Sequence, residues 1–228
     1  RNFANWQKDA NTLLDLHRRL GVRFFKADSI SLSSEQGRKN LQRLFAATRA
    51  GSNGNIVIDL DITAGTRPGY FGAPDVGPLF IENRYTDWHN YWPHHTLRNL
   101  WSLARWIDPA RLRFEFLNPG RNQNLYAGDP LAPACYSPDA LFATVMFSNP
   151  LAWCELSSLP DDFASQIAPM VPVWKIYRNE IFAGTILPVG AAPDGVAWTG
   201  FLSLADDDSH GYALVFRENN PHSSCRFA

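Results

Sequence analysis

Gly21-Val22-Arg23-Phe24-Phe25-Lys26-Ala27-Asp28 is the most informative segment of the chain. A short apolar run follows a helical pattern and ends in a lysine and an acid, which predicts a buried parallel strand with two charges at its carboxyl end. Barrel enzymes keep their catalytic groups at that end of the strands. Lys26 and Asp28 are two residues apart and therefore project from the same face, where the ammonium can offset the charge of the carboxylate. Asp28 is thus a candidate nucleophile, and a strand-end salt bridge without a catalytic role is the alternative.

Helical and strand patterns alternate on both sides of this stretch. Apolar spacing predicts helices over residues 5–20, 33–50, 96–107 and 163–182, and short apolar runs predict strands over 22–26, 56–61, 79–82 and 112–118. From about residue 185 the pattern changes to short alternating runs split by turns. About four or five βα units fall short of the eight that close a barrel. The sequence predicts an α/β fold in which 1–184 form a partial barrel and 185–228 a small antiparallel β domain; an open sheet whose acids are solvated strand ends is the alternative.

Composition narrows the classes of function. The 228 residues are 45% hydrophobic and 13% aromatic, enough to bury a substantial core. No apolar stretch approaches the roughly 20 residues of a membrane-spanning helix, and nothing in the sequence indicates export or a compartment. Lys and Arg number 21 against 22 Asp and Glu, and they form no basic stripe. Nucleic acid and membrane partners are therefore not expected, and neutral substrates fit the charge balance.

Cysteines and histidines do not indicate a metal site. Three widely spaced cysteines lack the pairing of zinc ligands, and we expect inert thiols or a single bridge: Cys135, Cys154 and Cys225. Three histidines lie close together without carboxylates at ligand spacing: His89, His94 and His95. We expect neither a metal nor another cofactor. Four aromatic residues are candidate faces for stacking on a sugar, with core packing as the alternative: Trp88, Tyr91, Trp92 and Trp153.

The opening stretch resembles a signature of the α-galactosidases of glycoside hydrolase family 36 (GH36) and, more broadly, of their clan of retaining α-glycosidases. In that signature, on strand four, a glycine and an apolar run end in Lys-Trp-Asp, and Ala27 stands here in place of the Trp. The segment 59–67 is similar to the strand-five segment Glu-x-Cys-x-Ser-Gly-Gly-Gly-Arg, which shapes the sugar pocket. Gly65 and Arg67 match it, while Asp59 and Asp61 stand where the family has Glu and Cys.

Later segments carry the resemblance through most of the chain. Pro150 to Leu156, Trp174 to Arg178 and Ile181 to Gly184 resemble the family's last strand and helix, and the tail from Thr185 fits the start of its C-terminal β-sandwich. The resemblance implies the second half of a (β/α)8 barrel of the TIM type, strands four to eight, followed by part of that sandwich. It also implies an N-terminal remainder of the same polypeptide, and it permits a homo-oligomer.

The activity that the resemblance implies is that of a retaining exo-α-glycosidase, which hydrolyses terminal α-galactosides of a small-molecule or oligosaccharide substrate by double displacement. Asp28 would be the nucleophile. The substrate-binding residues would be Lys26, Asp59, Asp61, Arg67, Arg84 and Trp88.

The acid/base is the main departure from the family. After strand six the family has Ser-Asp-Asp-x-Asp, whose first Asp is the general acid/base, whereas this chain has 82–88, Glu-Asn-Arg-Tyr-Thr-Asp-Trp. A match on the Thr-Asp pair puts Arg84 in the place of the acid, and arginine cannot donate a proton near neutral pH. We expect Asp87 to be the acid/base, because Trp88 can lower the polarity around it, with Glu82 as the fallback. The alternative role for either carboxylate is a salt bridge with an arginine and no part in catalysis. The alternative function of the protein is that of a catalytically inactive carbohydrate-binding relative.

Overall fold

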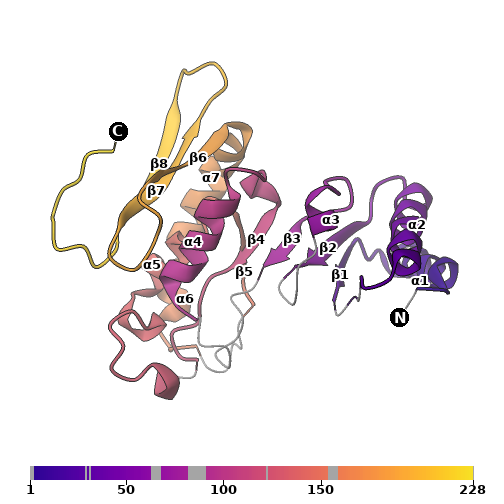
Figure 1. Cartoon of the computed structure of the whole chain (residues 1–228), viewed down its shortest axis with the longest axis horizontal. Coiled ribbons are helices and arrows are strands. Elements are labelled where there is room, and N and C mark those ends of the chain that lie inside the picture. Colours follow the sequence, from indigo (N-terminus) through magenta and orange to yellow (C-terminus); the bar gives the residue numbers. More distant parts are fainter. Residues whose placement is uncertain are drawn as a thin grey trace. The chain divides into compact units, whose positions relative to one another are not determined.

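A computed structural model of the chain describes residues 3–28, 30, 32–62, 68–81, 91–121, 123–153 and 159–227. The chain divides into two compact units, Arg1–Phe80 and Ile81–Ala228. Figure 1 shows alternating helices and strands in the first unit, and helices, two short strands and a separate twisted sheet in the second. No helix in the described residues has both the length and the apolar character needed to cross a membrane.

The N-terminal unit is built from βα repeats. Its elements are α1 (Trp6–Leu20), β1 (Phe24–Ala27), α2 (Glu35–Gly51), β2 (Val57–Asp61), α3 (Pro68–Phe71) and β3 (Leu79–Ile81), the last of which ends one residue into the second unit. Gly21 ends α1 in the left-handed conformation, at φ 71°, and its N–H bonds to the carbonyl oxygen of His17 at 2.9 Å. The side chain of Ser34 begins α2 by accepting a hydrogen bond from the N–H of Gly37. These ends confirm the two helices that the sequence predicts here.

Three parallel strands form the sheet of this unit, in the order β1-β2-β3. Lys26 lies opposite Asp59, and Asp61 lies opposite Phe80. Helices α1 and α2 lie side by side (Figure 1), and their apolar residues form the core with the strands. The buried residues of this core include Ala10, Leu14, Leu41, Leu44, Phe45, Ile58 and Leu60.

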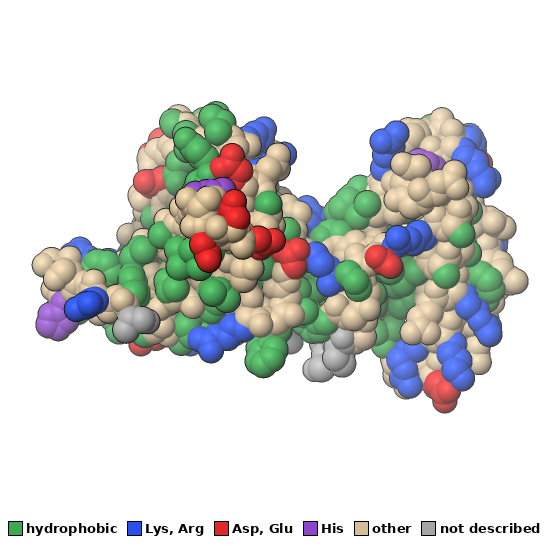
Figure 2. Space-filling view, turned by 90° about the horizontal axis from the view of Figure 1, so that it is seen from above, with side chains coloured by type: hydrophobic (Ala, Val, Ile, Leu, Met, Phe, Trp, Pro, Cys, Tyr) green, Lys and Arg blue, Asp and Glu red, His purple; other side chains and the backbone are tan. Residues whose placement is uncertain are grey.

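The outer faces of α1 and α2 are charged. In the face drawn in Figure 2, Lys and Arg side chains stand at the surface of this unit, at the right of the view. Two pairs one helical turn apart join them to acids, Arg19 to Asp15 at 3.1 Å and Lys39 to Glu35 at 2.6 Å. All four side chains are more than half exposed, so these pairs each contribute only a few tenths of a kcal/mol. The helices are therefore held mainly by their apolar faces.

The C-terminal unit combines helices, two parallel strands and an antiparallel sheet. Its elements are α4 (Pro93–Leu103), β4 (Leu112–Glu115), α5 (Pro138–Ala143), β5 (Asn149–Leu151), α6 (Phe163–Ile167), α7 (Met170–Ala183), β6 (Thr185–Gly190), β7 (Trp198–Leu204) and β8 (Gly211–Arg217). Short 3-10 helices lie at Pro109–Arg111, Gln123–Tyr126 and Pro133–Cys135. Strands β4 and β5 are parallel, and β6, β7 and β8 pair antiparallel in that order.

The helix predicted over 163–182 is two helices. α6 ends at Ile167 and α7 begins at Met170, with Pro169 between them. Proline lacks the N–H that would continue the hydrogen bonds of α6, although Ala168 before it keeps helical dihedral angles. Pro172 is tolerated because it lies in the first turn of α7, where the N–H groups have no partner within the helix. The prediction of one continuous helix was therefore wrong at this point.

The C-terminal sheet is tied to the helices by side-chain hydrogen bonds. The hydroxyl of Ser203 on β7 donates to the carbonyl oxygen of Ile181 at 2.7 Å, and the indole N–H of Trp101 on α4 donates to that of Val189 at 3.2 Å. The start of β6 at Thr185 confirms the predicted change to antiparallel strands. Five parallel strands occur in the described residues, fewer than a closed barrel requires. The division into a barrel part, 1–184, and a β domain, 185–228, stays a prediction.

Candidate functional site

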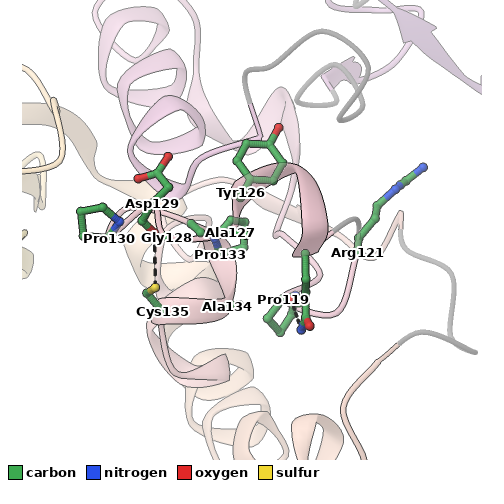
Figure 3. Close-up of a pocket in the computed structure, with 12 residues that line it drawn as sticks. Pro119, Arg121, Tyr126, Ala127, Gly128, Asp129, Pro130, Pro133, Ala134 and Cys135 are labelled. Atoms are coloured by element: carbon green, nitrogen blue, oxygen red, sulfur yellow. Dashed lines mark hydrogen bonds between the residues drawn. The ribbon is translucent and has the colours of Figure 1, made fainter.

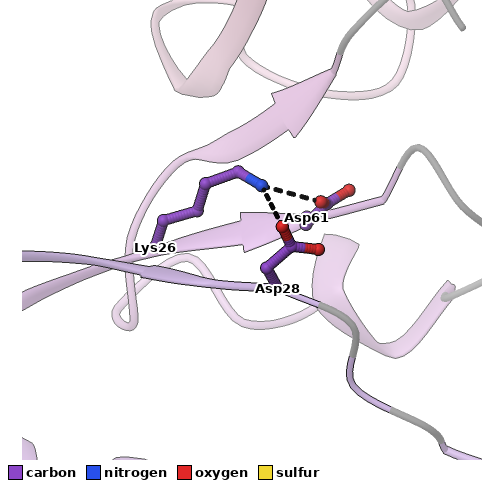
Figure 4. Close-up of polar contacts among 3 residues, drawn as sticks. All are labelled: Lys26, Asp28 and Asp61. Atoms are coloured by element: carbon purple, nitrogen blue, oxygen red, sulfur yellow. Dashed lines mark hydrogen bonds and ion pairs between the residues drawn. The ribbon is translucent and has the colours of Figure 1, made fainter.

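Three charged side chains meet at the carboxyl ends of β1 and β2. The ammonium of Lys26 donates to Oδ2 of Asp28 at 2.9 Å and to Oδ2 of Asp61 at 3.0 Å (Figure 4). Asp28 directly follows β1 and Asp61 is the last residue of β2. The two strands are parallel, so their carboxyl ends lie at the same edge of the sheet. Residues 26, 28 and 61 are hereafter called the Lys26 cluster.

The three side chains of the Lys26 cluster differ sharply in exposure. The side chain of Asp28 is 57% exposed, that of Lys26 is 21% exposed and that of Asp61 is 5% exposed. Asp28 is therefore accessible to an incoming molecule. Asp61 is a buried carboxylate, and a buried carboxylate stays ionised only where an opposite charge or hydrogen-bond donors compensate it. Lys26 supplies that compensation.

The side chain of Lys26 is protonated, and so positively charged, at neutral pH. Burial lowers the pKa of Lys26, but the hydrogen bonds and attraction from Asp28 and Asp61 outweigh burial, and the pKa is raised above 10.5. The ammonium also lies 4.1 Å from the ring centroid of Phe80, over the face of the ring.

Asp59, the register partner of Lys26, is 1% exposed in the middle of β2. Strands β1 and β2, with Asp28 directly after β1, thus gather one ammonium and three carboxyl groups on one face of the sheet.

A cavity of about 370 Å³ adjoins Asp28 on the side of the helices. Asp28 and Lys26 line one end of it, and its remaining walls are mainly apolar, with Phe25, Leu41 and Phe45 among them. Its volume falls within the range of small-molecule sites, about 300–1,000 Å³. Asp9 and Thr12 of α1 supply its other polar side chains. An apolar group fits these walls better than the hydroxyls of a sugar.

A second cavity, of about 350 Å³, lies in the C-terminal unit in the segment after β4 (Figure 3). Asp129 at its wall is engaged structurally, because Oδ2 accepts from the indole N–H of Trp92 at 2.7 Å and Oδ1 accepts from the N–H of Leu131 at 2.8 Å. Trp92 also packs edge-on against Tyr126, with ring centroids 5.5 Å apart. In Figure 3 the side chain of Arg121 points away from the other labelled side chains. Sequence patterns did not indicate this cavity, because a loop rich in Gly, Pro and Asp reads as turn material.

Comparison of the structure with solved proteins finds α-galactosidases. No family model and no curated protein matches the sequence. A variant of the GH36 α-galactosidase AgaA from Geobacillus stearothermophilus, in complex with raffinose, superposes with a TM-score of 0.67 at 11% identity, over 93% of this chain and 30% of that chain. The chain has the fold of this part of a GH36 α-galactosidase. The α-galactosidase from Lactobacillus brevis superposes with a TM-score of 0.60 at 13% identity, over 90% of this chain and 28% of that one.

The chain thus spans less than a third of the length of these GH36 structures. At such identities the likeness establishes the fold and leaves the activity to experiment. A second AgaA complex, with 1-deoxygalactonojirimycin, superposes with a TM-score of 0.68 at 12% identity. For the described residues, the α/β class, the five parallel strands and the separate antiparallel sheet agree with the resemblance of the sequence to GH36, whereas the barrel stays a prediction.

Several of the predicted site residues fall outside the described ranges. These are Arg67, Glu82, Arg84, Asp87 and Trp88, and their roles stay predictions. The structure brings together Lys26, Asp28 and Asp61 and places Asp59 beside them on the same strand face. Of the candidate stacking residues, Tyr91 is fully buried, so it belongs to the core, whereas Trp153 is 37% exposed.

Two adjacent histidines begin α4, and they are neutral near pH 7. The rings of His94 and His95 meet edge to face, with centroids 4.7 Å apart. Burial, helped by the positive charge of Arg98, lowers the pKa of both, that of His95 to about 4. Within the described ranges, no three or more His, Cys, Asp or Glu side chains are grouped to hold a metal.

The lowered pKa of His95 predicts a loss of stability in mild acid. The unfolded chain binds a proton on His95 as the pH falls through 6.5, whereas the folded chain binds it only near pH 4. Between pH 7 and pH 5, the free energy of unfolding of the wild type should therefore fall by about 1–2 kcal/mol more than that of His95→Gln. Urea unfolding at both pH values measures this, with His222→Gln, an exposed histidine, as the matched control. Equal losses in all three proteins would contradict the prediction.

Proposed function

We propose that the protein is a retaining exo-α-glycosidase that hydrolyses terminal α-galactosides. The observation that carries the proposal is the Lys26 cluster, in which an exposed carboxylate, that of Asp28, is held at the carboxyl edge of parallel strands. Its support is the place of this cluster in a fold like that of GH36 α-galactosidases. Barrel enzymes carry their catalytic residues at this edge of the strands.

In the proposed mechanism Asp28 attacks the anomeric carbon of the terminal sugar. The bond from that carbon to the leaving oxygen breaks as the acid/base, Asp87 or Glu82, protonates the oxygen. Water then attacks the anomeric carbon of the covalent intermediate, the bond from that carbon to the Asp28 oxygen breaks, and the same acid/base, now ionised, takes up the proton of the water. Two displacements at one carbon return the original anomeric configuration, and the two carboxyl groups need a separation of about 5–5.5 Å.

The ammonium of Lys26 fits the electrostatic needs of this mechanism. A nucleophilic carboxylate must be ionised, and a positive charge at hydrogen-bond distance favours the ionised form. Lys26 meets this condition at 2.9 Å from Asp28. Arg67, Arg84 and Trp88 are proposed to bind the sugar.

The fold neighbours are the support for the proposed substrate class. AgaA variants have been solved in complex with raffinose and with stachyose. We propose that this protein likewise accepts oligosaccharides that end in an α-galactosyl unit.

Hydrolysis of an aryl α-galactoside by the native polypeptide tests the function. We expect turnover, with α-galactose as the first product seen by NMR before mutarotation, and no turnover of the matched aryl β-galactoside. Absence of turnover with every aryl α-glycoside tried would refute the glycosidase, and a β-configured first product would refute the retaining mechanism.

A carbohydrate-binding protein without catalysis is the second candidate. The observation that favours it is Arg84, which stands where the family has its acid. Calorimetric titration with raffinose decides between the two. Binding without hydrolysis, unaffected by Asp87→Ala, would favour the binding protein.

We also propose that the chain works within a longer polypeptide whose further strands complete the barrel. Its support is the match to about 30% of the length of AgaA. The intact mass of the protein from its native source tests this, since a mass well above 25.6 kDa is expected. Light scattering of the same sample would show whether it forms a homo-oligomer.

A further inference from the structure

Asp61 is the least exposed member of the Lys26 cluster. Its side chain is only 5% exposed, yet its Oδ2 lies 3.0 Å from the ammonium of Lys26. Asp61 also stands where the family pattern has a cysteine, so its carboxylate distinguishes this chain from that pattern. We propose that Asp61 is a positioning residue, which acts through Lys26 to fix the place and the ionisation of the nucleophile Asp28. This inference rests on the proposed function for its catalytic meaning.

The first part of the argument is geometric. The lysine side chain is a flexible four-carbon stem, and contacts of its ammonium are needed to hold it in one conformation. Asp61 anchors the ammonium from β2, and the ring of Phe80 on β3 lies 4.1 Å below it. Asp28 follows a strand end and is more exposed than either anchor. The well-buried anchors therefore place the ammonium, and the ammonium places Asp28.

The second part is electrostatic. Two carboxylates share one ammonium, so Lys26 stabilises the charge of Asp28 while the charge of Asp61 opposes it. Two further acids belong to the surroundings of the cluster: Asp59 on β2 is the register partner of Lys26, and Asp9 on α1 lines the same cavity as Asp28. Strand β3 contributes only apolar residues, Leu79–Ile81. Removal of the charge at Asp61 should therefore take away a repulsion on the carboxylate of Asp28 while the attraction of Lys26 remains.

A direct titration of Asp28 tests the proposal without any need for catalysis. The native polypeptide is labelled with ¹³C-aspartate, and the carboxyl resonance of Asp28 is identified by its loss in Asp28→Asn. In Asp61→Asn we expect the titration midpoint of Asp28 to fall by about 0.5–1 pH unit. The matched control is Asp15→Asn, which removes an equal charge from an exposed pair with Arg19 and should leave the midpoint unchanged.

Two further variants keep the test decisive. Asp61→Glu retains the charge and should keep the midpoint near that of the wild type, whereas Lys26→Met should raise it. If Asp61→Asn does not fold, the rise in Lys26→Met decides whether the ammonium governs Asp28. A midpoint in folded Asp61→Asn that equals that of the wild type, or a midpoint in Lys26→Met that does not rise, overturns the proposal.

The pH profile of catalysis adds the functional readout. In Asp61→Asn the acidic limb of kcat/KM toward an aryl α-galactoside should move to lower pH by the same amount, with kcat reduced about tenfold or more and KM changed little. A loss of kcat without a shift of the limb would indicate a merely structural role and overturn the proposal. If the wild type shows no turnover at all, the glycosidase function fails, and the titration still decides whether Asp61 controls Asp28 through Lys26.

Discussion

Replacement of Asp28 by Asn is expected to lower kcat toward an aryl α-galactoside by roughly 10³-fold or more, because an amide cannot attack the anomeric carbon. Asparagine keeps the shape of the side chain, and its amide oxygen can still accept the hydrogen bond from Lys26. The fold should therefore persist while the covalent step is lost. Initial rates of phenolate release measure the effect, and circular dichroism checks the fold.

Asp75→Asn is the matched control for this variant. Asp75 lies before β3, its side chain is 78% exposed, and it pairs with Arg49 at 3.4 Å, so its replacement removes one carboxylate away from the Lys26 cluster. We expect the control to retain the wild-type rate. Activity of Asp28→Asn within tenfold of the wild type would exclude Asp28 as the nucleophile.

Replacement of the acid/base should lower the rate of hydrolysis by an amount that depends on the leaving group of the substrate. For Asp87→Asn we expect kcat to fall by roughly 10²–10⁴-fold with raffinose, whose leaving oxygen needs a proton. A dinitrophenyl α-galactoside should be affected far less in the glycosylation step, because its leaving group departs without protonation. The ratio of the two losses, obtained from kcat/KM, is the diagnostic quantity.

Glu82→Gln separates the two candidate acids. If Asp87 is the acid/base, Glu82→Gln should show no dependence of its effect on the leaving group. The opposite pattern, in which Glu82→Gln alone discriminates between raffinose and the dinitrophenyl substrate, would transfer the role to Glu82. Equal losses with both substrates in both variants would exclude both residues as the acid.

Local patterns predicted most elements of the described part. The helical spacing before Gly21 and the apolar run after it predicted α1 and β1, because one glycine in the left-handed conformation ends the helix where the run begins. The strand begins at Phe24 rather than Val22, although the carbonyl of Arg23 already accepts from Val57. The apolar spacing of a helix continues across Pro169, so the sequence did not predict the break between α6 and α7.

The site was predictable only in part. That Lys26 and Asp28 share a face follows from the two-residue period of a strand, and the structure confirms their contact. The contact of Lys26 with Asp61 joins residues 35 apart, and it depends on the register between two strands, which no local pattern encodes. Only the resemblance to the family placed Asp61 near the sugar pocket. The cavity beside Asp129 depends on loop packing, for which the sequence carries no periodic signal.

The pairing of Lys26 with Asp59 has a consequence for how the site comes into being. Side chains alternate between the two faces of a strand, so a slip of β1 along β2 by one residue would put Asp61 on the opposite side from the ammonium. The strands would still be paired, and the molecule would still be compact, yet its charges would be scattered. Correct alignment of two neighbouring strands during folding is thus the event that assembles the Lys26 cluster.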